Sequence, residues 1–306
     1  MGPAVTQPAP RPAPGSEGKA GGARAARPAR LRFNAWAVTI VPGLAFLTAF
    51  FLIPLGGMIY RSFTDPGPET YRIFVENELY VRVLWTTLRT SAIVTVATLL
   101  LAYPYAYVML RSGFRMTAVL GGLVLLPFWS SILVRTYAWT VLLQDSGVIN
   151  SALQRLGLVD EALSLMRNDL GVTIGMSHIL LPFMVFPIYA VMTRIDPDLM
   201  PAAESLGARP WRAFVRVFWP LSLPGVFAGS LLVFVLSIGF YITPALLGSP
   251  ANTMYSVLVV DMVSRQLQFG VGSAMGVVLL LVTLALLWIG TRVVRLGDVL
   301  GVEIGQ

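Results

Sequence analysis

Three arginines at helical spacing follow two small residues beyond the middle of the chain. Arg209, Arg212 and Arg216 lie three and then four residues apart, so their side chains fall along one side of a helix. Ala202 and Ala203 precede them and have side chains small enough for another backbone to approach closely. Positive charge beside small side chains suits a contact with another protein chain more than it suits a reaction.

The same segment has the residues of a helix, a turn and a second helix. Asp196 or Asp198 can cap a short helix that runs from Met200 to Leu206. Gly207 can leave that helix in a left-handed conformation, and Pro210 suits the first turn of the next helix. We expect this pair to lie at a membrane surface and to be held by a partner protein. An ordinary amphipathic helix pair with solvated charges is the alternative.

Residues for catalysis and metal binding are scarce in the sequence. The chain has one histidine and no cysteine, which excludes disulfides and leaves no cluster of metal ligands. Gly18 and Lys19 lack the preceding glycine that a phosphate-binding loop requires. No nucleophile, base and orienting acid stand together. We therefore expect that this chain is not an enzyme and binds no metal or cofactor itself.

Composition indicates a membrane protein. Of the 306 residues, 56% are hydrophobic and 12% are charged, whereas soluble domains carry about 25% charged residues. The net charge of +7 arises largely in one tail and in loops between apolar segments, which favours membrane topology over a nucleic-acid-binding face. We expect a disordered basic tail at residues 1–33, a membrane domain at 34–295 and a C-terminal tail at 296–306.

Six apolar segments are long enough to cross a bilayer as helices, since a span needs about 20 residues. Backbone polar groups in lipid must pair internally, and no segment alternates as a barrel strand does. We expect an all-α membrane protein with six transmembrane helices, kinked but not broken by internal prolines. The expected spans are residues 36–60, 84–110, 117–143, 171–193, 219–246 and 270–292. The prolines are Pro42, Pro54, Pro104, Pro127, Pro182, Pro187 and Pro224.

Basic residues in short loops and tails predict the orientation, because Lys and Arg are retained on the cytoplasmic side. The larger basic group falls in the tails and in the loops after the second and fourth spans, so both termini are expected in the cytoplasm. Most acids fall in the opposite loops. The cytoplasmic group is Arg11, Lys19, Arg24, Arg27, Arg30, Arg32, Arg111, Arg115, Arg194, Arg209, Arg212, Arg216, Arg292 and Arg295. The opposite basic residues are Arg61, Arg72, Arg82, Arg155, Arg167 and Arg265.

Three ionisable residues lie in or near the apolar segments, where such groups are costly and often functional. Arg89 and Arg135 can instead lie near the outer ends of their helices and extend to the lipid headgroups. His178 is more simply a neutral, hydrogen-bonded residue packed between helices than a proton relay, because its segment has no nearby acid.

The arginine-bearing segment resembles the cytoplasmic loop of the ABC-class, binding-protein-dependent importer permeases. That family has Glu-Ala-Ala, three residues and Gly, followed by a Leu-Pro-like ending. Here Pro201-Ala202-Ala203-Glu204-Ser205-Leu206-Gly207 stands in the signature, and Val217, Trp219 and Pro220 stand in the downstream pattern. Pro201 departs from the family's Glu and removes an acid from the expected ATPase contact. Glu204, about one helical turn later, is our hypothetical substitute.

The resemblance covers roughly residues 36–295, and the spermidine/putrescine importer permeases are the most similar branch. Three stretches carry it: LAYPYAYVMLRS at 101–112, LPFWSSILVRTYAWTVLLQDSGVINSAL at 126–153 and IGMSHILLPFMVFPIYAVM at 174–192. It implies the type I importer permease fold in the cell inner membrane, with this chain forming half of the translocation pathway for a polyamine. Other small organic solutes, such as an amino-acid derivative, are the alternative cargo.

The same resemblance implies several partners. They are two ATP-binding cassette ATPase subunits that hydrolyse ATP, a second homologous permease subunit, an extracytoplasmic solute-binding protein and membrane lipid. No nucleic acid partner is expected. The implied ATPase-coupling loop comprises Pro201, Ala202, Ala203, Glu204, Gly207, Arg209, Arg212 and Pro220.

A polyamine would be stabilised along its path by aromatic faces and carboxylates. The candidates for that path are Trp129, Arg135, Tyr137, Trp139, Phe240 and Tyr241. Packing, or a belt at the membrane interface, is the other explanation for these aromatic residues. The spans lack carboxylates, so affinity for a cation should reside mainly in the receptor, and an anionic or zwitterionic cargo paired with Arg135 stays open.

Two other classes of membrane protein compete with this interpretation. A secondary transporter would need no partner for the loop, but it often shows intramembrane acids or an internal repeat, and neither is evident. A membrane-embedded enzyme would need catalytic residues clustered at one depth.

Overall fold

The computed structural model of the chain describes residues 35–65 and 67–299. Within these ranges the chain is helical and has no strand, which confirms the predicted all-α class. The tail predicted at residues 1–33 lies outside the described residues, and so does most of the tail predicted at 296–306. Five helices are long and apolar enough to cross a membrane, and one bent pair can form a sixth span.

The first span begins in a unit of its own that extends to Phe51. This unit contains α1 (Ala35–Leu47) and most of the π-helical turn η1 (Thr48–Leu52). The span covers Ile40–Thr64, which overlaps the predicted residues 36–60. The apolar side chains from Ile40 onward in this unit are exposed, as suits contact with lipid.

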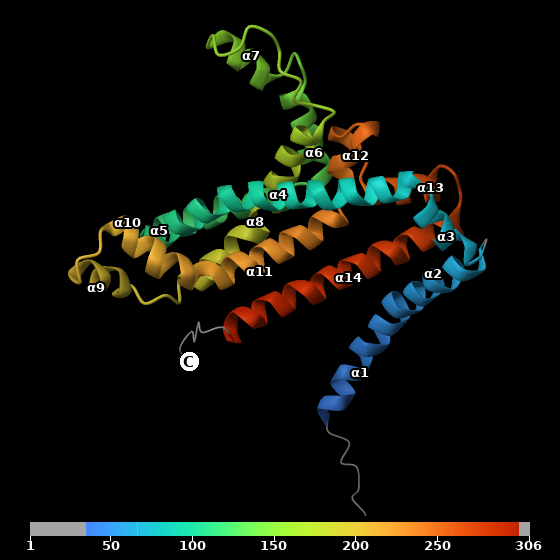
Figure 1. Cartoon of the computed structure of the whole chain (residues 1–306), viewed down its shortest axis with the longest axis horizontal. Helices are drawn as coiled ribbons and strands as arrows, with labels where there is room; N and C mark the ends of the chain where they lie inside the picture. Colours follow the sequence, from blue (N-terminus) through green and yellow to red (C-terminus); the bar gives the residue numbers. More distant parts are fainter. Residues whose placement is uncertain (1–34, 66, 300–306) are drawn as a thin grey trace, which may run out of the picture. The chain divides into compact units, whose positions relative to one another are not determined.

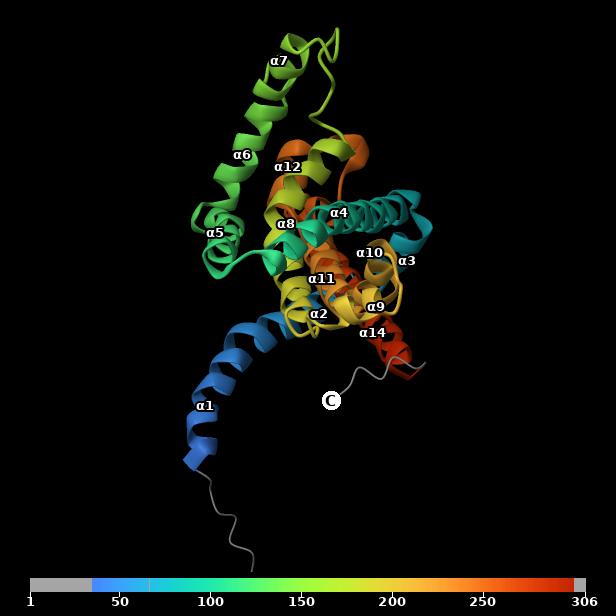
Figure 2. The ribbon, with the colours of Figure 1, turned by 90° about the vertical axis from the view of Figure 1, so that its left-hand side faces the viewer.

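Four long helices form the core of the second unit. α4 (Glu78–Arg111), α8 (Asp169–Met192) and α11 (Trp219–Ile238) pack against one another, and α14 (Phe269–Val299) packs beside α11. Both ribbon views show these four helices side by side (Figures 1 and 2). α8 is the most buried of the membrane-spanning helices in the described residues, because half of its most apolar stretch is buried inside the protein.

Glycines of α11 set its close distance from α8. A Cβ atom added to Gly225 would lie 3.0 Å from the Cα of Ile188. One added to Gly229 would lie 3.1 Å from the carbonyl oxygen of Met184. Small residues commonly allow membrane helices to approach this closely, and van der Waals contact then stabilises the pair.

Prolines inside these helices leave them continuous, as predicted. Pro104 lies within α4, Pro182 and Pro187 within α8, and Pro224 within α11. Buried hydroxyl groups are also accommodated within their own helices. Thr98 donates to the carbonyl of Val94 at 2.6 Å, and Thr95 and Ser237 make the same bond one turn back.

The third expected span, residues 117–143, is not one helix. α5 (Phe114–Leu125) and the 3₁₀ turn η2 (Leu126–Trp129) form its first part, and α6 (Ile132–Leu143) starts a second part at 99° to the first. The prediction that Pro127 only kinks this span is therefore wrong. Ser130 and Ser131 follow with extended backbone, with ψ of 149° and 140°. The Ser130 hydroxyl donates to the Pro127 carbonyl at 2.8 Å, and the Ser131 side chain makes no capping bond to α6.

The fifth expected span, residues 219–246, also ends earlier than predicted. α11 stops at Ile238, and a separate short helix, α12 (Ile242–Leu247), follows it. The hydroxyls of Thr136 on α6 and Thr243 on α12 lie 3.1 Å apart. Because this hydrogen bond is buried, it attaches α12 to the second half of the broken span.

A second core lies where the shorter helices meet the start of α14. α2 (Ile53–Thr64), α3 (Glu69–Glu76) and α13 (Tyr255–Ser264) pack against α14, and the 3₁₀ turn η4 (Pro250–Asn252) precedes α13. The Thr87 hydroxyl of α4 accepts a hydrogen bond from the backbone N–H of Tyr255 at 2.7 Å, which fixes the start of α13 on α4. The buried members of this core are Phe74, Val83, Tyr255, Met262, Ala274 and Met275.

A folded segment connects α6 to α8. It contains α7 (Val148–Arg155). Gly157, two residues after the helix, has φ of 68°. The fully buried Asn150 holds the following stretch, because its Nδ2 donates to the Leu163 carbonyl and its Oδ1 accepts from the Leu163 N–H, both at 2.9 Å. The helix ends with bonds from Gly157 N to Gln154 O and from Leu158 N to Leu153 O, both at 3.0 Å.

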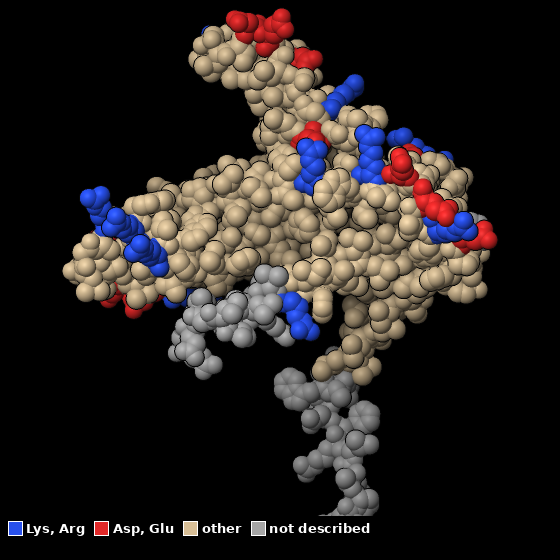
Figure 3. All heavy atoms as spheres, in the orientation of Figure 1, with Lys and Arg blue, Asp and Glu red and all other residues tan. Residues whose placement is uncertain are grey.

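Charge is distributed along the second unit in the way a membrane protein requires. Figure 3 shows basic side chains at the end that carries α9 and α10, and mixed charges toward the end that carries α3. The intervening surface in this view is mostly uncharged, apart from a basic and acidic pair near its middle and a basic side chain at its lower edge. The exposed surface between the two ends is therefore suited to the hydrocarbon layer.

Candidate functional site

The segment between α8 and α11 forms the predicted helix, turn and helix. α9 (Leu199–Ser205) is followed by Gly207 with φ of 90°, and then by α10 (Pro210–Ala213) and the π-helical turn η3 (Phe214–Phe218) that leads into α11. Gly207 N donates to Glu204 O at 2.9 Å, and Ala208 N donates to Ala203 O at 3.1 Å. These bonds complete a left-handed glycine end of the kind that the sequence predicts.

The start of α9 differs in detail from the prediction. Asp198 occupies the N-cap position, but its side chain makes no capping hydrogen bond. Asp196 acts instead, because its Oδ1 accepts from the Asp198 N–H at 2.9 Å and fixes the turn before the helix. Pro201 falls in the first turn of α9, where a missing N–H costs little, so its departure from the family signature leaves the helix intact.

The outward side of this loop joins charged and apolar side chains. Glu204, Arg209 and Arg212 are exposed, and Leu206 is 90% exposed. Trp211 is 72% exposed. The sequence analysis missed Leu206 and Trp211, although large apolar residues on either side of a turn glycine are a signal for a contact surface. We call this set the loop surface: Pro201, Ala202, Glu204, Leu206, Arg209, Trp211 and Arg212.

Aromatic rings connect the loop surface to the membrane helices. The ring of Trp211 stacks on Phe214 with centroids 5.9 Å apart, and Phe214 stacks on Phe218 at 5.6 Å. Tyr107 of α4 contacts both phenylalanines edge-on, at 5.5 and 5.3 Å. The loop is therefore in direct packing contact with the end of α4 through these rings.

A second contact of this kind reaches α11. Tyr103 of α4 lies 4.8 Å from the ring of Trp219, and its hydroxyl is 2.9 Å from the Ser222 hydroxyl. Pro220, predicted to belong to the loop, is half-buried in the first turn of α11. The aromatic cluster, made of Tyr103, Tyr107, Trp211, Phe214, Phe218 and Trp219, is thus a packed junction between the loop and two core helices.

The ionisable residues near the spans have identifiable surroundings. Arg89 lies 3.8 Å from Asp169 at the start of α8, in an ion pair that the sequence analysis did not predict. His178 accepts a hydrogen bond at Nδ1 from the indole N–H of Trp139, at 3.2 Å. This confirms a hydrogen-bonded histidine between helices, and the accepting Nδ1 carries no proton in this arrangement.

The residues predicted for the solute path do not form one group. Trp129 and Tyr137 are exposed, whereas Trp139 and Phe240 pack against the main core. Arg135 is half-buried, and its Nε is buried without a hydrogen-bond partner in the described part of the chain. Tyr241 alone of the predicted set lines a pocket found in the described residues.

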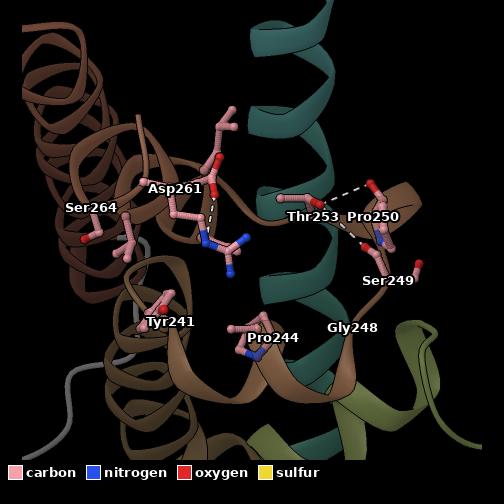
Figure 4. A pocket seen from close by; sticks show the side chains of 13 residues that line it. Tyr241, Pro244, Gly248, Ser249, Pro250, Thr253, Asp261 and Ser264 are labelled. Carbon is pink, nitrogen blue, oxygen red and sulfur yellow. Dashed lines mark hydrogen bonds and ion pairs between the residues drawn. The ribbon is translucent and has the colours of Figure 1, made fainter. Parts of the chain in front are cut away.

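That pocket lies between α12, η4 and α13 and has a volume of about 470 Å³ (Figure 4). Tyr241 and Pro244 line one side, Ser249 and Thr253 another, and Asp261 projects from α13. From the sequence, Asp261 is only one of the acids expected in the loops opposite the cytoplasmic basic group. The signal that the sequence analysis missed was the short apolar run of α13, which this acid interrupts.

Comparison with known proteins now identifies the class. Residues 113–296, more than half of the chain, match the family described as the binding-protein-dependent transport system inner membrane component. The chain belongs to this family. The permease loop and most of the helical core described above lie within the matched residues.

Individual relatives of this permease are also similar in sequence. The spermidine/putrescine transport system permease protein PotB of Haemophilus influenzae is 33% identical over 80% of this chain and 85% of its own length. The inner membrane ABC transporter permease protein YdcU of Escherichia coli is 39% identical over 57% of this chain and 61% of its own length. The chain is therefore an ABC importer permease, and the expected family is confirmed.

A solved structure supports the fold of this permease. A chain in the crystal structure of a bacterial alginate ABC transporter, in complex with an alginate pentasaccharide-bound periplasmic protein, matches with a TM-score of 0.69 at 19% identity. The match covers 85% of this chain and 93% of that chain. The type I importer permease fold is thus confirmed. As a multi-pass inner-membrane permease of this class, the chain works with an ATPase and a binding protein.

Proposed function

We propose that this permease forms half of the translocation pathway for a polyamine, with spermidine and putrescine as the expected cargo. The observation that carries the proposal is the 33% identity to PotB across 80% of the chain. PotB of Escherichia coli, named for the same spermidine/putrescine transport system, is 36% identical over 176 residues. Similarity over this length, which includes the membrane helices, supports a related cargo as well as a related fold.

The proposed assembly contains this chain, a second homologous permease, two ATPase subunits and an external solute-binding protein. One loop per chain requires two permease chains to engage two ATPases. In the orientation that we propose, both termini and the loop surface lie in the cytoplasm. Arg111, the last residue of α4, and Arg115, in the first turn of α5, are both exposed, and two basic residues at this junction support a cytoplasmic position for it.

The mechanism proposed for this assembly uses the aromatic cluster. ATP binding in the partner subunits would draw the ATPase pair together and displace the loop surface. The packed rings of Phe214 and Tyr107 would pass this displacement to α4 and α11 and turn the cavity from inward-facing to outward-facing. ATP is hydrolysed by the partner subunits, and this chain binds no cofactor.

The experiment that tests the function is uptake of radiolabelled spermidine and putrescine into vesicles that hold this chain with its co-purifying partners and its binding protein. We expect uptake that requires ATP and is absent with a non-hydrolysable ATP analogue. Uptake that continues without ATP would contradict the importer mechanism and favour a secondary transporter. No uptake of either polyamine, with the ATPase subunits still present and active, would reject the cargo and retain the importer.

An anionic or zwitterionic solute, such as an amino-acid derivative, is the second candidate cargo. It is favoured by Arg135, whose buried Nε has no hydrogen-bond partner in the described residues and can pair with a carboxylate. The vesicle experiment separates the two candidates by competition. Excess unlabelled amino-acid derivative should leave spermidine uptake unchanged if the cargo is a polyamine.

Glu204 provides a test of the loop surface as the ATPase contact. We propose that its exposed carboxylate on α9 replaces the acid that Pro201 removes from the signature. Glu204→Ala should weaken association with the ATPase about tenfold, because a charge-assisted hydrogen bond contributes about 1.5–3 kcal/mol. The measurement is ATPase retained on purified permease over a dilution series. Glu161→Ala, an exposed acid in the segment between α7 and α8, is the control, and equal retention by both variants would reject the role of Glu204.

A further inference from the structure

The pocket beside α13 combines hydroxyl groups, one carboxylate, one aromatic face and the Arg265 side chain with apolar residues. The Thr253 hydroxyl donates to the carbonyl of Pro250 at 3.0 Å, which leaves the hydroxyl's own lone pairs available (Figure 4). Tyr241 is partly exposed at the wall, and Asp261 is the one acid in the lining. Carboxylate, hydroxyl and aromatic groups together are the surroundings that stabilise an organic ammonium ion. A volume of about 470 Å³ lies within the range of small-molecule sites.

Of the described residues that line this pocket, Asp261 is the only negatively charged one, and Arg265 is the only positively charged one. Asp261 lies in the last turn of α13, at the end of the helix where the helix dipole places a partial negative charge. A carboxylate at this end is unfavourable unless a cation accompanies it. The acids at the first residues of the described spans, Glu78 of α4 and Asp169 of α8, do not line this pocket.

The cation that accompanies Asp261 is held only loosely. Arg265 Nε lies 3.4 Å from Asp261 Oδ1, and the Arg265 side chain is 84% exposed, against 33% for Asp261. Gln266 Nε2 donates to the other carboxylate oxygen at 3.1 Å. An ion pair with one partner so exposed is weak and is easily replaced by another cation. The carboxylate would keep its bond to Gln266 during such an exchange.

We propose that Asp261 receives a primary ammonium group of the cargo, which displaces Arg265 and lies against Tyr241 and Thr253. In the proposed orientation this pocket faces the outside, so it is the first site that the cargo meets after release from the binding protein. The inference rests on the proposed polyamine function and adds the residue that recognises the charge. It also accounts for cation recognition in a permease whose described spans hold few acids.

The test compares three variants in the spermidine uptake experiment. Uptake is measured at a series of concentrations of the spermidine-loaded binding protein. Asp261→Asn keeps the shape and the Gln266 contact but removes the charge, and it should raise KM about tenfold with little change in the maximal rate. Arg265→Gln removes the competing cation, and it should leave KM unchanged or lower it. Glu76→Gln is the matched control, because Glu76 forms the same type of exposed ion pair, one turn from Arg72, on α3 and outside the pocket.

The outcomes separate this inference from the proposed function. If the unaltered protein takes up no polyamine, the proposed function fails first. If it does take up polyamine and Asp261→Asn matches Glu76→Gln, the pocket is not the ammonium site. If Arg265→Gln raises KM as much as Asp261→Asn does, the ion pair only shapes the turn after α13, and the inference is overturned. ATPase activity stimulated by the receptor should be equal in all variants, which checks that each assembles.

Discussion

Gly207→Val should reduce ATP-dependent uptake about 5- to 30-fold and should remove much of the ATPase that co-purifies with the permease. Gly207 has φ of 90°, a region that costs an ordinary side chain about 1–2 kcal/mol and a β-branched one more. No atom lies within 4 Å of the position of an added Cβ, so the effect comes from backbone strain and not from a clash. Strain of this size changes the population of the docking conformation by a factor of about 5–30.

The control for this variant is in the same chain. Gly157 ends α7 with φ of 68°, has equally open space and is followed by the same pair of backbone hydrogen bonds. Gly157→Val therefore imposes similar strain in the segment between α6 and α8. It should leave ATPase co-purification unchanged. Equal retention of the ATPase by the two valine variants would show that the turn after α9 does not shape the ATPase contact.

Gly225→Val should lower the stability of the helical core more than any other glycine change on α11 that leaves the loop intact. The added side chain would meet the Cα of Ile188 and the carbonyl oxygen of Pro187, both at 3.0 Å. These are backbone atoms, so side-chain rotation cannot relieve the overlap and α11 must move away from α8. Overpacking of this kind costs about 1–3 kcal/mol, occasionally more.

The measurement is the thermal unfolding midpoint of purified permease in detergent, followed by tryptophan fluorescence. A loss of each 1 kcal/mol corresponds to a decrease of about 2–4 °C for a chain of this size range. Gly122→Val on α5 is the control, because no atom lies within 4 Å of its added Cβ. A midpoint that falls equally in both variants would mean that the α8–α11 contact is looser than the structure indicates.

The helical class and the loop were predictable because their signals are local. Apolar length defines a span, and the alanine pair, Gly207 and Pro210 define a helix, a left-handed turn and a helix within a few residues. The prediction failed at Pro127, where the same residue type that leaves α4, α8 and α11 continuous accompanies a break of 99°. Whether a proline kinks or ends a helix depends on partners for the freed carbonyls, and those partners come from tertiary structure.

The functional pocket was beyond sequence reasoning for a related reason. Tyr241 follows α11, whereas Thr253 and Asp261 belong to segments on the other side of α12. Only the early end of α11 and the separate helix α12 bring these residues to one pocket. Leu206 was missed because a single exposed leucine in a turn has no periodic neighbour that would mark it.

The buried hydroxyl groups of the core helices bear on how the core can move. Thr95, Thr98 and Ser237 each bond to a carbonyl of their own helix. Their hydrogen bonds therefore survive when α4 or α11 slides lengthwise against a neighbour. The cross-helix bond from Tyr103 to Ser222 lies at the loop end, and that from Thr136 to Thr243 joins α6 to α12. Sliding of α4 against α11 would break the Tyr103–Ser222 bond, whereas the bonds that Thr95, Thr98 and Ser237 make within their own helices would remain.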